Sequence, residues 1–321
     1  MADLVLYVVL AVIGYFIARR LGKAEKNYEM FGYIQTWVIA LLVFSMGTRM
    51  GANKEVIGNL NRIGLYALLM TILTVAFSVV CVSIVRKILK IDKYGSFSCK
   101  AAKIEVPPES DDSSGGGTMT LFIVLSVILG MMLGYFLMEK NVYDYQSLNS
   151  LAGMIIKIGL CALLFMVGFD MGLNDEFIEN VKEAGFRVLL FPIAICVGTL
   201  LGAFICSVCI DIPIREGLAI GAGFGWYSMA PALIMERGFA TASAISFMHN
   251  IFRELAALLC IPFVAKKIGY LETVAMPGSG ASDVCLPLIV KSTKSEIALY
   301  SFVAGIGVSL MVPILVPLFL K

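Results

Sequence analysis

The chain has 321 residues, of which 59% are hydrophobic and 15% are charged, and its formal net charge at pH 7 is +2. Soluble domains are about 45–50% apolar and about 25% charged, so this composition excludes an ordinary soluble domain and predicts an integral membrane protein. The small net charge gives no reason to expect nucleic acid as a partner. The eight cysteines stand mostly alone in apolar segments, where we expect small buried hydrophobic side chains and no metal site.

Eight apolar runs are candidates for membrane-spanning helices, each of which needs about 20 residues. They lie at 4–18, 33–50, 65–85, 119–138, 150–171, 187–209, 240–265 and 297–320. Two shorter segments, 217–235 and 275–290, are interrupted by glycine and proline, and we expect them to be re-entrant. The predicted fold is an all-α polytopic membrane protein with about eight spans and two broken segments. Ten full spans are the alternative.

The chain repeats itself across a polar segment at 94–118, whose Ser, Gly and Pro are typical of a flexible linker. Residues 42–64 align without a gap on residues 163–185, at an offset of 121. In the first spans of the two copies, Gly14-Tyr15-Phe16 matches Gly134-Tyr135-Phe136. Each copy contains three spans, so the copies must cross the membrane in opposite directions. Inverted repeats of this kind are typical of secondary transporters.

The distribution of Lys and Arg predicts the orientation, because cytoplasmic loops are enriched in both. With the N-terminus outside, most of these residues fall in cytoplasmic loops, and the outer loops hold only Lys54, Arg62, Lys140, Arg215 and Arg237. We therefore predict a multi-pass protein of the cytoplasmic membrane with both termini outside. Its predicted parts are a first repeat at 1–93, a cytoplasmic linker at 94–118, a second repeat at 119–210 and a region with the functional site at 211–321.

The first broken segment contains the sequence GLAIGAGFGWYSMAP. Hydrocarbon leaves backbone polar groups unsatisfied, so a break is tolerated only where it is buried in protein or lines a cavity. Gly223 and Gly225 allow a ligand to approach the backbone, and Trp226, Tyr227 and Ser228 offer an aromatic face, a phenol and a hydroxyl. We expect a solute site here, with tight helix packing through small residues as the alternative.

Polar residues also enter the apolar run at 240–265. Asn250 and Glu254 are four residues apart and share a face of the expected helix. Arg253 diverges from Glu254 by about 100°, so the two should have different partners. Ionisable residues at this depth are functional candidates, and Glu254 could hold an ammonium group or a proton. The alternative is an Arg–Glu pair that only fastens helices.

The second broken segment, PGSGASDVCLP, places Ser282 and Asp283 between small residues and a proline. A carboxylate beside a broken helix is a candidate ligand for a cation or a proton. The alternative makes Asp283 the N-cap of the helix that follows, and the two roles are compatible.

Three more residues are candidates for a structural or coupling role. Arg49 and Asp170 occupy equivalent positions in the two repeats, and we predict a bridge between them. Glu55 also has an equivalent, Glu176. Both acids lie near the ends of spans, where a solvated side chain is expected.

The motifs GLAIGAGFGWYS, NIFRELAALLCIP and ASDVCLP, preceded by FMVG and followed by SLMVPILVP, resemble the lysine exporter (LysO) family. The match covers nearly the whole chain and is most specific in 216–287. The resemblance implies proton-linked export of lysine and of toxic analogues such as thialysine. It also implies functional intramembrane acids: the acid of the family's RELA motif falls on Glu254, its SxD position falls on Asp283, and a further acid falls near Glu55.

The residues themselves fit such a substrate, because lysine carries two ammonium groups and one carboxylate. Glu254 and Asp283 could hold the ammonium groups, the helix that restarts after GFGWYS could hold the carboxylate, and Trp226 could face the alkyl chain. We predict lysine, protons and the lipid bilayer as partners and no cofactor, and we leave a homodimer as an open alternative.

Three other functions fit part of the sequence. A sodium-coupled carrier of organic anions or amino acids would contain similar broken helices, but the acids near the predicted site favour a cationic group in the substrate. A passive channel can also contain inverted repeats. An intramembrane aspartyl protease would need YD and GxGD motifs in its membrane helices; GxGD does not occur and the YD at 143–144 lies outside the apolar runs, so we expect no enzyme.

Overall fold

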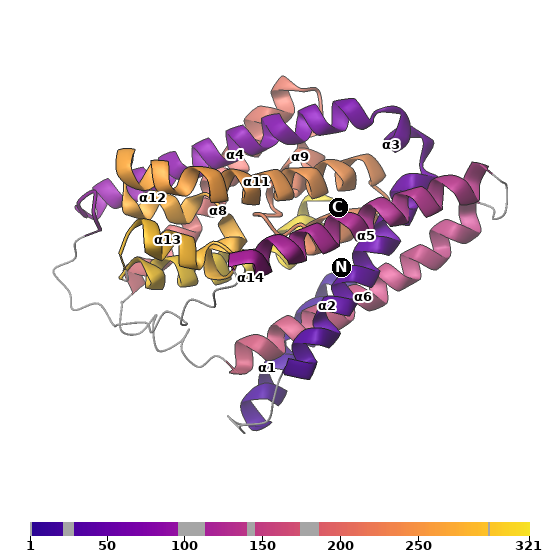
Figure 1. Cartoon of the computed structure of the whole chain (residues 1–321), viewed down its shortest axis with the longest axis horizontal. Helices are drawn as coiled ribbons and strands as arrows, with labels where there is room; N and C mark the ends of the chain where they lie inside the picture. The colour runs from indigo at the N-terminus through magenta and orange to yellow at the C-terminus, as the bar shows by residue number, and fades with distance from the viewer. Residues whose placement is uncertain (1, 22–28, 96–112, 140–144, 174–185, 295) are drawn as a thin grey trace. The chain divides into compact units, whose positions relative to one another are not determined.

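The computed structural model of the chain is built from helices (Figure 1). It describes residues 2–21, 29–95, 113–139, 145–173, 186–294 and 296–321, and this part of the chain contains no β-strand. The helices are α1 (Ala2–Leu21), α2 (Glu29–Ala52), α3 (Lys54–Gly58), α4 (Leu60–Ile88), α5 (Ser113–Glu139), α6 (Tyr145–Leu173), η1 (Phe186–Leu189), α8 (Leu190–Cys209), α9 (Ile214–Gly221), α10 (Met229–Glu236), α11 (Ala240–Lys267), α12 (Tyr270–Ala275), η2 (Gly278–Ser282), α13 (Leu286–Ser292) and α14 (Ile297–Phe319).

Each predicted apolar run is helical in the structure. The eight runs correspond to α1, α2, α4, α5, α6, η1 with α8, α11 and α14. Among the described residues, five stretches are long and apolar enough to cross a membrane: Leu60–Ile88, Ser147–Phe169, Arg187–Cys209, Ala240–Lys267 and Ile297–Phe319. The all-helical, polytopic class is therefore confirmed, while the full number of spans stays a prediction. Helix α5 begins at Ser113, inside the predicted linker, and residues 96–112 of that linker lie outside the described residues.

The helices form two compact units, each described here by itself. Unit 1 comprises Met1–Ile63, Ser113–Asp175 and Pro231–Ala244, and contains α1, α2, α3, α5 and α6. Unit 2 comprises Gly64–Asp112, Glu176–Ala230 and Ile245–Lys321, and contains most of α4 and α11 together with α8, α9, α12, α13 and α14.

In unit 1, α1 lies beside α6 and α2 lies beside α5 (Figure 1). Glycines bring the backbones of each pair close together. A side chain at Gly14 of α1 would collide with the carbonyl oxygen of Phe165 in α6, and one at Gly130 of α5 would collide with the carbonyl oxygen of Phe44 in α2. Small residues are the usual means of helix association in lipid, where burial of apolar surface gives no driving force.

The glycine contacts of the two pairs correspond to each other. They are Gly168 with Ala11 and Gly172 with Tyr15 between α6 and α1, and Gly47 with Val127 and Gly51 with Met131 between α2 and α5. Gly47 and Gly168 are aligned at the offset of 121, and they contact Val127 and Ala11, respectively. By these contacts Ala11 of α1 aligns with Val127 of α5, and Gly14 of α1 aligns with Gly130 of α5. The matching Gly-Tyr-Phe triplets, which equate Gly14 with Gly134, are therefore wrong by four residues. A shift of about one helical turn leaves the same residues on the same face of the helix. A match of three residues is therefore too short to fix the register.

In unit 2, α4 and α8 cross at close range. A side chain at Gly198 of α8 would meet the main chain of Phe77 in α4 at 2.6 Å. At the crossing, the hydroxyl oxygens of Ser78 and Thr199 are 2.7 Å apart, and both residues are fully buried. These two residues are 121 positions apart, so equivalent positions of the two sequence copies touch each other.

Both predicted broken segments are interrupted helices. The first consists of α9 and α10, with eight residues each, and the second consists of α12, η2 and α13. A helix of eight residues is about 12 Å long, which is less than half of the roughly 30 Å hydrocarbon core. No single piece can therefore cross the bilayer. Whether each segment turns back or crosses as a whole stays a prediction.

Helix α14 supports the second segment. Ser301 of α14 donates a hydrogen bond of 2.6 Å to the carbonyl of Ala281. A side chain at Gly305, one turn further along, would collide with the backbone nitrogen of Ser282. Phe191 of α8 packs edge-on against Tyr300, with ring centroids 5.3 Å apart. The 3₁₀ helix η2 thus packs against α14, which in turn packs against α8.

The close packing of unit 1 predicts that Gly51→Leu will destabilise the protein. A Cβ at Gly51 collides with the main chain of Met131, which cannot move without separating α2 from α5. We expect a loss of at least about 3 kcal/mol, the upper range for overpacking, and a lower melting temperature in detergent. Gly58→Leu is the matched control, because nothing lies within 4 Å of a Cβ at Gly58. Equal melting temperatures for the two variants would contradict the proposed contact.

Candidate functional site

The candidate site is organised by α11, which carries a row of buried polar side chains into unit 2. His249, Asn250 and Arg253 are fully buried, and Glu254 is 6% exposed. Because a buried polar group without a partner costs free energy, the hydrogen bonds of these residues show which parts of the structure depend on them. Two of them contact the interruptions of the broken segments, which we call the first break (residues 222–228) and the second break (residues 276–285).

Asn250 holds the first break. Its Oδ1 accepts a hydrogen bond of 2.8 Å from the backbone N–H of Gly225, and its Nδ2 donates to the carbonyl and the hydroxyl of Ser246. Gly223 leaves room for this side chain, since a Cβ there would lie 2.7 Å from Nδ2. Phe224 and Gly225 have φ angles of +46° and +97°, so the backbone needs a fixed partner in this left-handed conformation. Both ends of the Asn250 amide are thus engaged in positioning the break.

Arg253 holds the second break. Its Nε donates to the carbonyl of Met276 at 3.0 Å and its Nη2 to the carbonyl of Ala275 at 3.1 Å, at the C-terminal end of α12. A third hydrogen bond, 3.3 Å long, joins Nη1 to the hydroxyl of Thr199. Unpaired carbonyls at a helix C-terminus carry partial negative charge and therefore favour a cation. This guanidinium thus bonds to two backbone carbonyls and one hydroxyl, and whether Glu254 has different partners stays a prediction.

The two breaks contact each other directly. The backbone N–H of Ser279 donates a hydrogen bond of 2.8 Å to the carbonyl of Phe224. A side chain at Gly225 would collide with the carbonyl oxygen of Pro277, and one at Gly278 would collide with that of Phe224. Gly225 and Gly278 also have positive φ angles, +97° and +68°. Glycine is required at both positions, because no other residue combines this backbone conformation with such close approach.

Glu254 and Asp283 are both in the vicinity of Cys285, which is fully buried. Glu254 itself is buried, whereas Asp283 is exposed. The alternative role of Asp283 as a helix cap is wrong: Cys285 is the N-cap residue of α13, and no side chain bonds to the first amides of this helix. The Ser282 hydroxyl is engaged within its own turn, where it donates to the carbonyl of Ser279 at 3.1 Å.

The aromatic part of the first broken segment connects the break to α10. The backbone N–H of Trp226 donates to the carbonyl of Gly223 at 2.8 Å, and the N–H of Ala230 donates to the carbonyl of Trp226 at 3.1 Å. Trp226 and Tyr227 are half-buried, and Ser228 is buried. They lie next to the first break in the chain, and their role as an aromatic wall stays a prediction.

The predicted residues of unit 1 are described only in part. Arg49 donates a hydrogen bond of 2.7 Å from Nε to Oδ1 of Asn149. Asp170 lies in α6 and Glu55 lies in α3, but their side chains are outside the described part of the structure. The Arg49–Asp170 bridge and the role of Glu55 therefore stay predictions.

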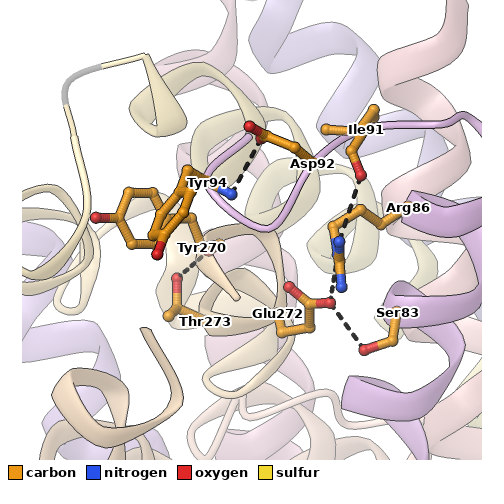
Figure 2. A network of polar contacts seen from close by, with 8 residues as sticks. All are labelled: Ser83, Arg86, Ile91, Asp92, Tyr94, Tyr270, Glu272 and Thr273. Carbon is orange, nitrogen blue, oxygen red and sulfur yellow. Dashed lines mark hydrogen bonds and ion pairs between the residues drawn. The ribbon is translucent and has the colours of Figure 1, made fainter. Parts of the chain in front are cut away.

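Sequence reasoning missed one buried carboxylate of unit 2. Glu272 of α12 is fully buried and forms an ion pair with Arg86 of α4, with Nε and Oε1 2.7 Å apart (Figure 2). His249 lies with its Nδ1 2.9 Å from the Thr71 hydroxyl. By the charge pattern Arg86 falls in a cytoplasmic loop, where a basic residue needs no buried carboxylate as its partner. The signal that could have found it is a lone acid in the apolar run YLETVAMP, next to the second break.

Comparison with known proteins agrees with the resemblance seen in the motifs. Residues 124–320 match the family described as "Lysine exporter LysO". The chain is 23% identical over 318 residues to "Lysine exporter LysO" of Escherichia coli (strain K12), a match that covers 99% of each chain. It is also 27% identical over 201 residues to "Putative lysine exporter" of Haemophilus influenzae, which covers 61% of this chain and 96% of that relative. By its motifs, by this match over more than half of its length and by its helical membrane fold, the chain belongs to the lysine exporter LysO family.

Proposed function

We propose that the protein exports L-lysine, and analogues such as thialysine, across the cytoplasmic membrane by proton antiport. Membership of the family and the names of two relatives support lysine as the substrate. The observation that carries the mechanism is the pair of carboxylates, Glu254 and Asp283, in the vicinity of Cys285 next to two crossing helix breaks. Broken helices of this kind are where secondary transporters bind their substrates.

In the proposed mechanism, Glu254 and Asp283 bind either protons or ammonium groups of lysine, but not both together. A carboxylate that takes a proton loses the charge that attracts an ammonium group. Protons arriving from outside would therefore release lysine, and deprotonation towards the cytoplasm would restore the affinity. Asp283 has the larger accessible surface and Glu254 is buried, so Asp283 is the acid that an arriving solute would reach first.

Asn250 and Arg253 act in this mechanism as positioning residues. Their hydrogen bonds to Gly225, Ala275 and Met276 fix the backbone on either side of the crossing. A fixed backbone keeps the distance between Glu254 and Asp283 constant, which suits a substrate with two ammonium groups. Trp226 and Tyr227 would face the alkyl chain between those groups.

We further infer that the two sequence copies are inverted structural repeats. Two observations support this: equivalent glycines make equivalent contacts in the α1–α6 and α2–α5 pairs, and Ser78 touches its own equivalent, Thr199. A residue that touches its equivalent lies on the axis that relates the two copies. Thr199 also accepts the hydrogen bond from Arg253, so the axis would pass beside the second break. Inverted repeats provide the two alternate states that antiport requires.

The mechanism predicts that Glu254→Gln will lose lysine transport driven by a pH gradient in proteoliposomes. Glutamine keeps the shape but has neither the charge nor the proton, and loss of a charged hydrogen bond of about 1.5–3 kcal/mol lowers flux by roughly tenfold or more. Glu254→Asp should keep partial activity, because its charge survives one methylene shorter. Glu296→Gln, at an exposed acid before α14, is the matched control. Normal pH-dependent transport by Glu254→Gln would show that this carboxylate is structural.

The predicted orientation can be tested with a cysteine that the chain already contains, Cys99 in the linker. In a variant whose other cysteines are replaced by serine or alanine, a membrane-impermeant maleimide should label Cys99 in inside-out vesicles and not in intact cells. The linker is expected in the cytoplasm, because Lys and Arg are concentrated in the loops on its side. Labelling in intact cells would reverse the topology.

A further inference from the structure

Glu272 has an unusual environment for a buried carboxylate. Its Oε1 accepts two hydrogen bonds, from Arg86 Nε at 2.7 Å and from the Ser83 hydroxyl at 2.8 Å (Figure 2). Its Oε2 is buried and has no hydrogen-bond partner among the described residues. Arg86 also donates to the carbonyl of Ile91 at 3.3 Å, which fixes the guanidinium at the end of α4. The carboxylate is therefore held by one oxygen, and the other oxygen is an open acceptor.

Helix capping does not explain this carboxylate. Glu272 is the third residue of α12, from which a glutamate commonly bonds back to the N–H of the N-cap residue. The N-cap N–H, that of Gly269, instead donates to the carbonyl of Val264 at 3.0 Å, and the N–H of Tyr270 donates to the carbonyl of Lys93 at 3.0 Å. Both donors are already used. Gly269 also lies directly against Oε2, where a Cβ would collide with this oxygen.

A purely structural ion pair is also a poor explanation. Arginine usually binds a carboxylate through two parallel hydrogen bonds, one to each oxygen, and a buried pair is stabilising only when the remaining lone pairs are satisfied. Here the guanidinium meets Oε1 alone, and Oε2 faces away from it into the protein (Figure 2). An ion pair that only holds α4 and α12 together would not need Oε2 to point away from Arg86. A carboxylate that binds a cation on the side opposite Arg86 would need this orientation.

We propose that Glu272 is a second cation-binding carboxylate of the transport path, whose Oε2 receives an ammonium group of the substrate before it reaches Glu254. This inference rests on the proposed function. Arg86 and Ser83 keep the carboxylate charged and oriented through Oε1. The positive charge of Arg86 also weakens the attraction for a second cation, and a position along a path must bind weakly enough to release its ligand.

The position of Glu272 fits the cytoplasmic start of an export path. It lies against the last turn of α4, and α12 follows the C-terminal end of α11 at Lys266 and Lys267, which the predicted topology places in the cytoplasm. Glu254 is 13 residues before Lys267, or about 20 Å along α11. Helix α12 begins near that cytoplasmic end and its last residue contacts Arg253, so Glu272 lies between Lys267 and the turn of α11 that carries Glu254.

Helix α12 connects this position to the second break. Glu272 is in its first turn, and the carbonyl of its last residue, Ala275, accepts a hydrogen bond from Arg253. Thr273 donates to the carbonyl of Tyr270 at 2.6 Å within the same short helix. An ammonium group at Oε2 would thus bind to the same six-residue helix whose far end Arg253 holds at the second break.

The test measures lysine uptake into inside-out membrane vesicles, where the cytoplasmic face is exposed to known lysine concentrations. The variants are Glu272→Gln, the neutral pair Glu272→Gln with Arg86→Gln, and the control Glu296→Gln, which removes an exposed acid outside this cluster. We expect Glu272→Gln to raise the KM for lysine by roughly five- to tenfold with a smaller change in maximal rate, the neutral pair to stay impaired, and Glu296→Gln to keep a nearly unchanged KM.

Recovery of the normal KM by the neutral pair would overturn the proposal, because a purely structural contact between residues 86 and 272 can be made by two neutral side chains. An unchanged KM in Glu272→Gln would overturn it as well. Melting temperatures of the purified variants separate misfolding from loss of binding. Glu272→Asp is a second variant that keeps the charge. If it is folded and has a lower KM than Glu272→Gln, the proposal is supported. If wild-type vesicles take up no lysine, the proposed function itself has failed, so the two failures are distinguishable.

Discussion

The structure of unit 2 depends on one requirement: backbone groups freed by a broken helix must find partners inside the protein. Hydrocarbon offers none, and each unsatisfied group there costs several kcal/mol. Helix α11 supplies both kinds of partner from neighbouring turns. Asn250 presents an acceptor to the N–H of Gly225, and Arg253 presents donors to the carbonyls of Ala275 and Met276. An amide suits the first break and a guanidinium the second, because the second has an excess of carbonyl oxygens. The crossing of the breaks, and with it the surroundings of Glu254 and Asp283, follows from these contacts.

The sequence predicted the elements of the fold well and the functions of single side chains less well. Apolar length alone located every long helix, since a spanning helix must be continuous and apolar. Asn250 was singled out as a polar residue on one helix face with Glu254, but the sequence could not show that its partner is a backbone N–H 25 residues earlier in the chain. Arg253 likewise bonds to carbonyls 22 and 23 residues later. A periodic pattern shows that a side chain is buried, but such distant partners depend on how two interruptions pack against each other.

The repeat illustrates the same limit at the level of register. Ten identities between 42–64 and 163–185 fix the offset of 121, and the contact between Ser78 and Thr199 extends it to the third helices. The first helices lack such a long match, and the short Gly-Tyr-Phe triplet differs by one turn from the alignment that the proposed repeat and its glycine contacts favour. Glu272 was missed for a related reason: the sequence shows an acid in one segment and a basic residue in another, and only the fold brings Ser83, Arg86 and Glu272 together.

The pairing of helices in unit 1 has a consequence for how the protein is made. The glycine faces of α1 and α2 are covered by α6 and α5, which come from the later copy, so the first two helices have no partner for these faces when they leave the ribosome. About 120 residues separate the end of α2 from the end of α6, and at about 5–20 residues per second their synthesis takes roughly 6–24 s. During that time the glycine faces of α1 and α2 are in contact with lipid. Because small residues are the usual means of helix association in lipid, the same glycine faces that permit the final close packing are open to other membrane helices until α5 and α6 have been made.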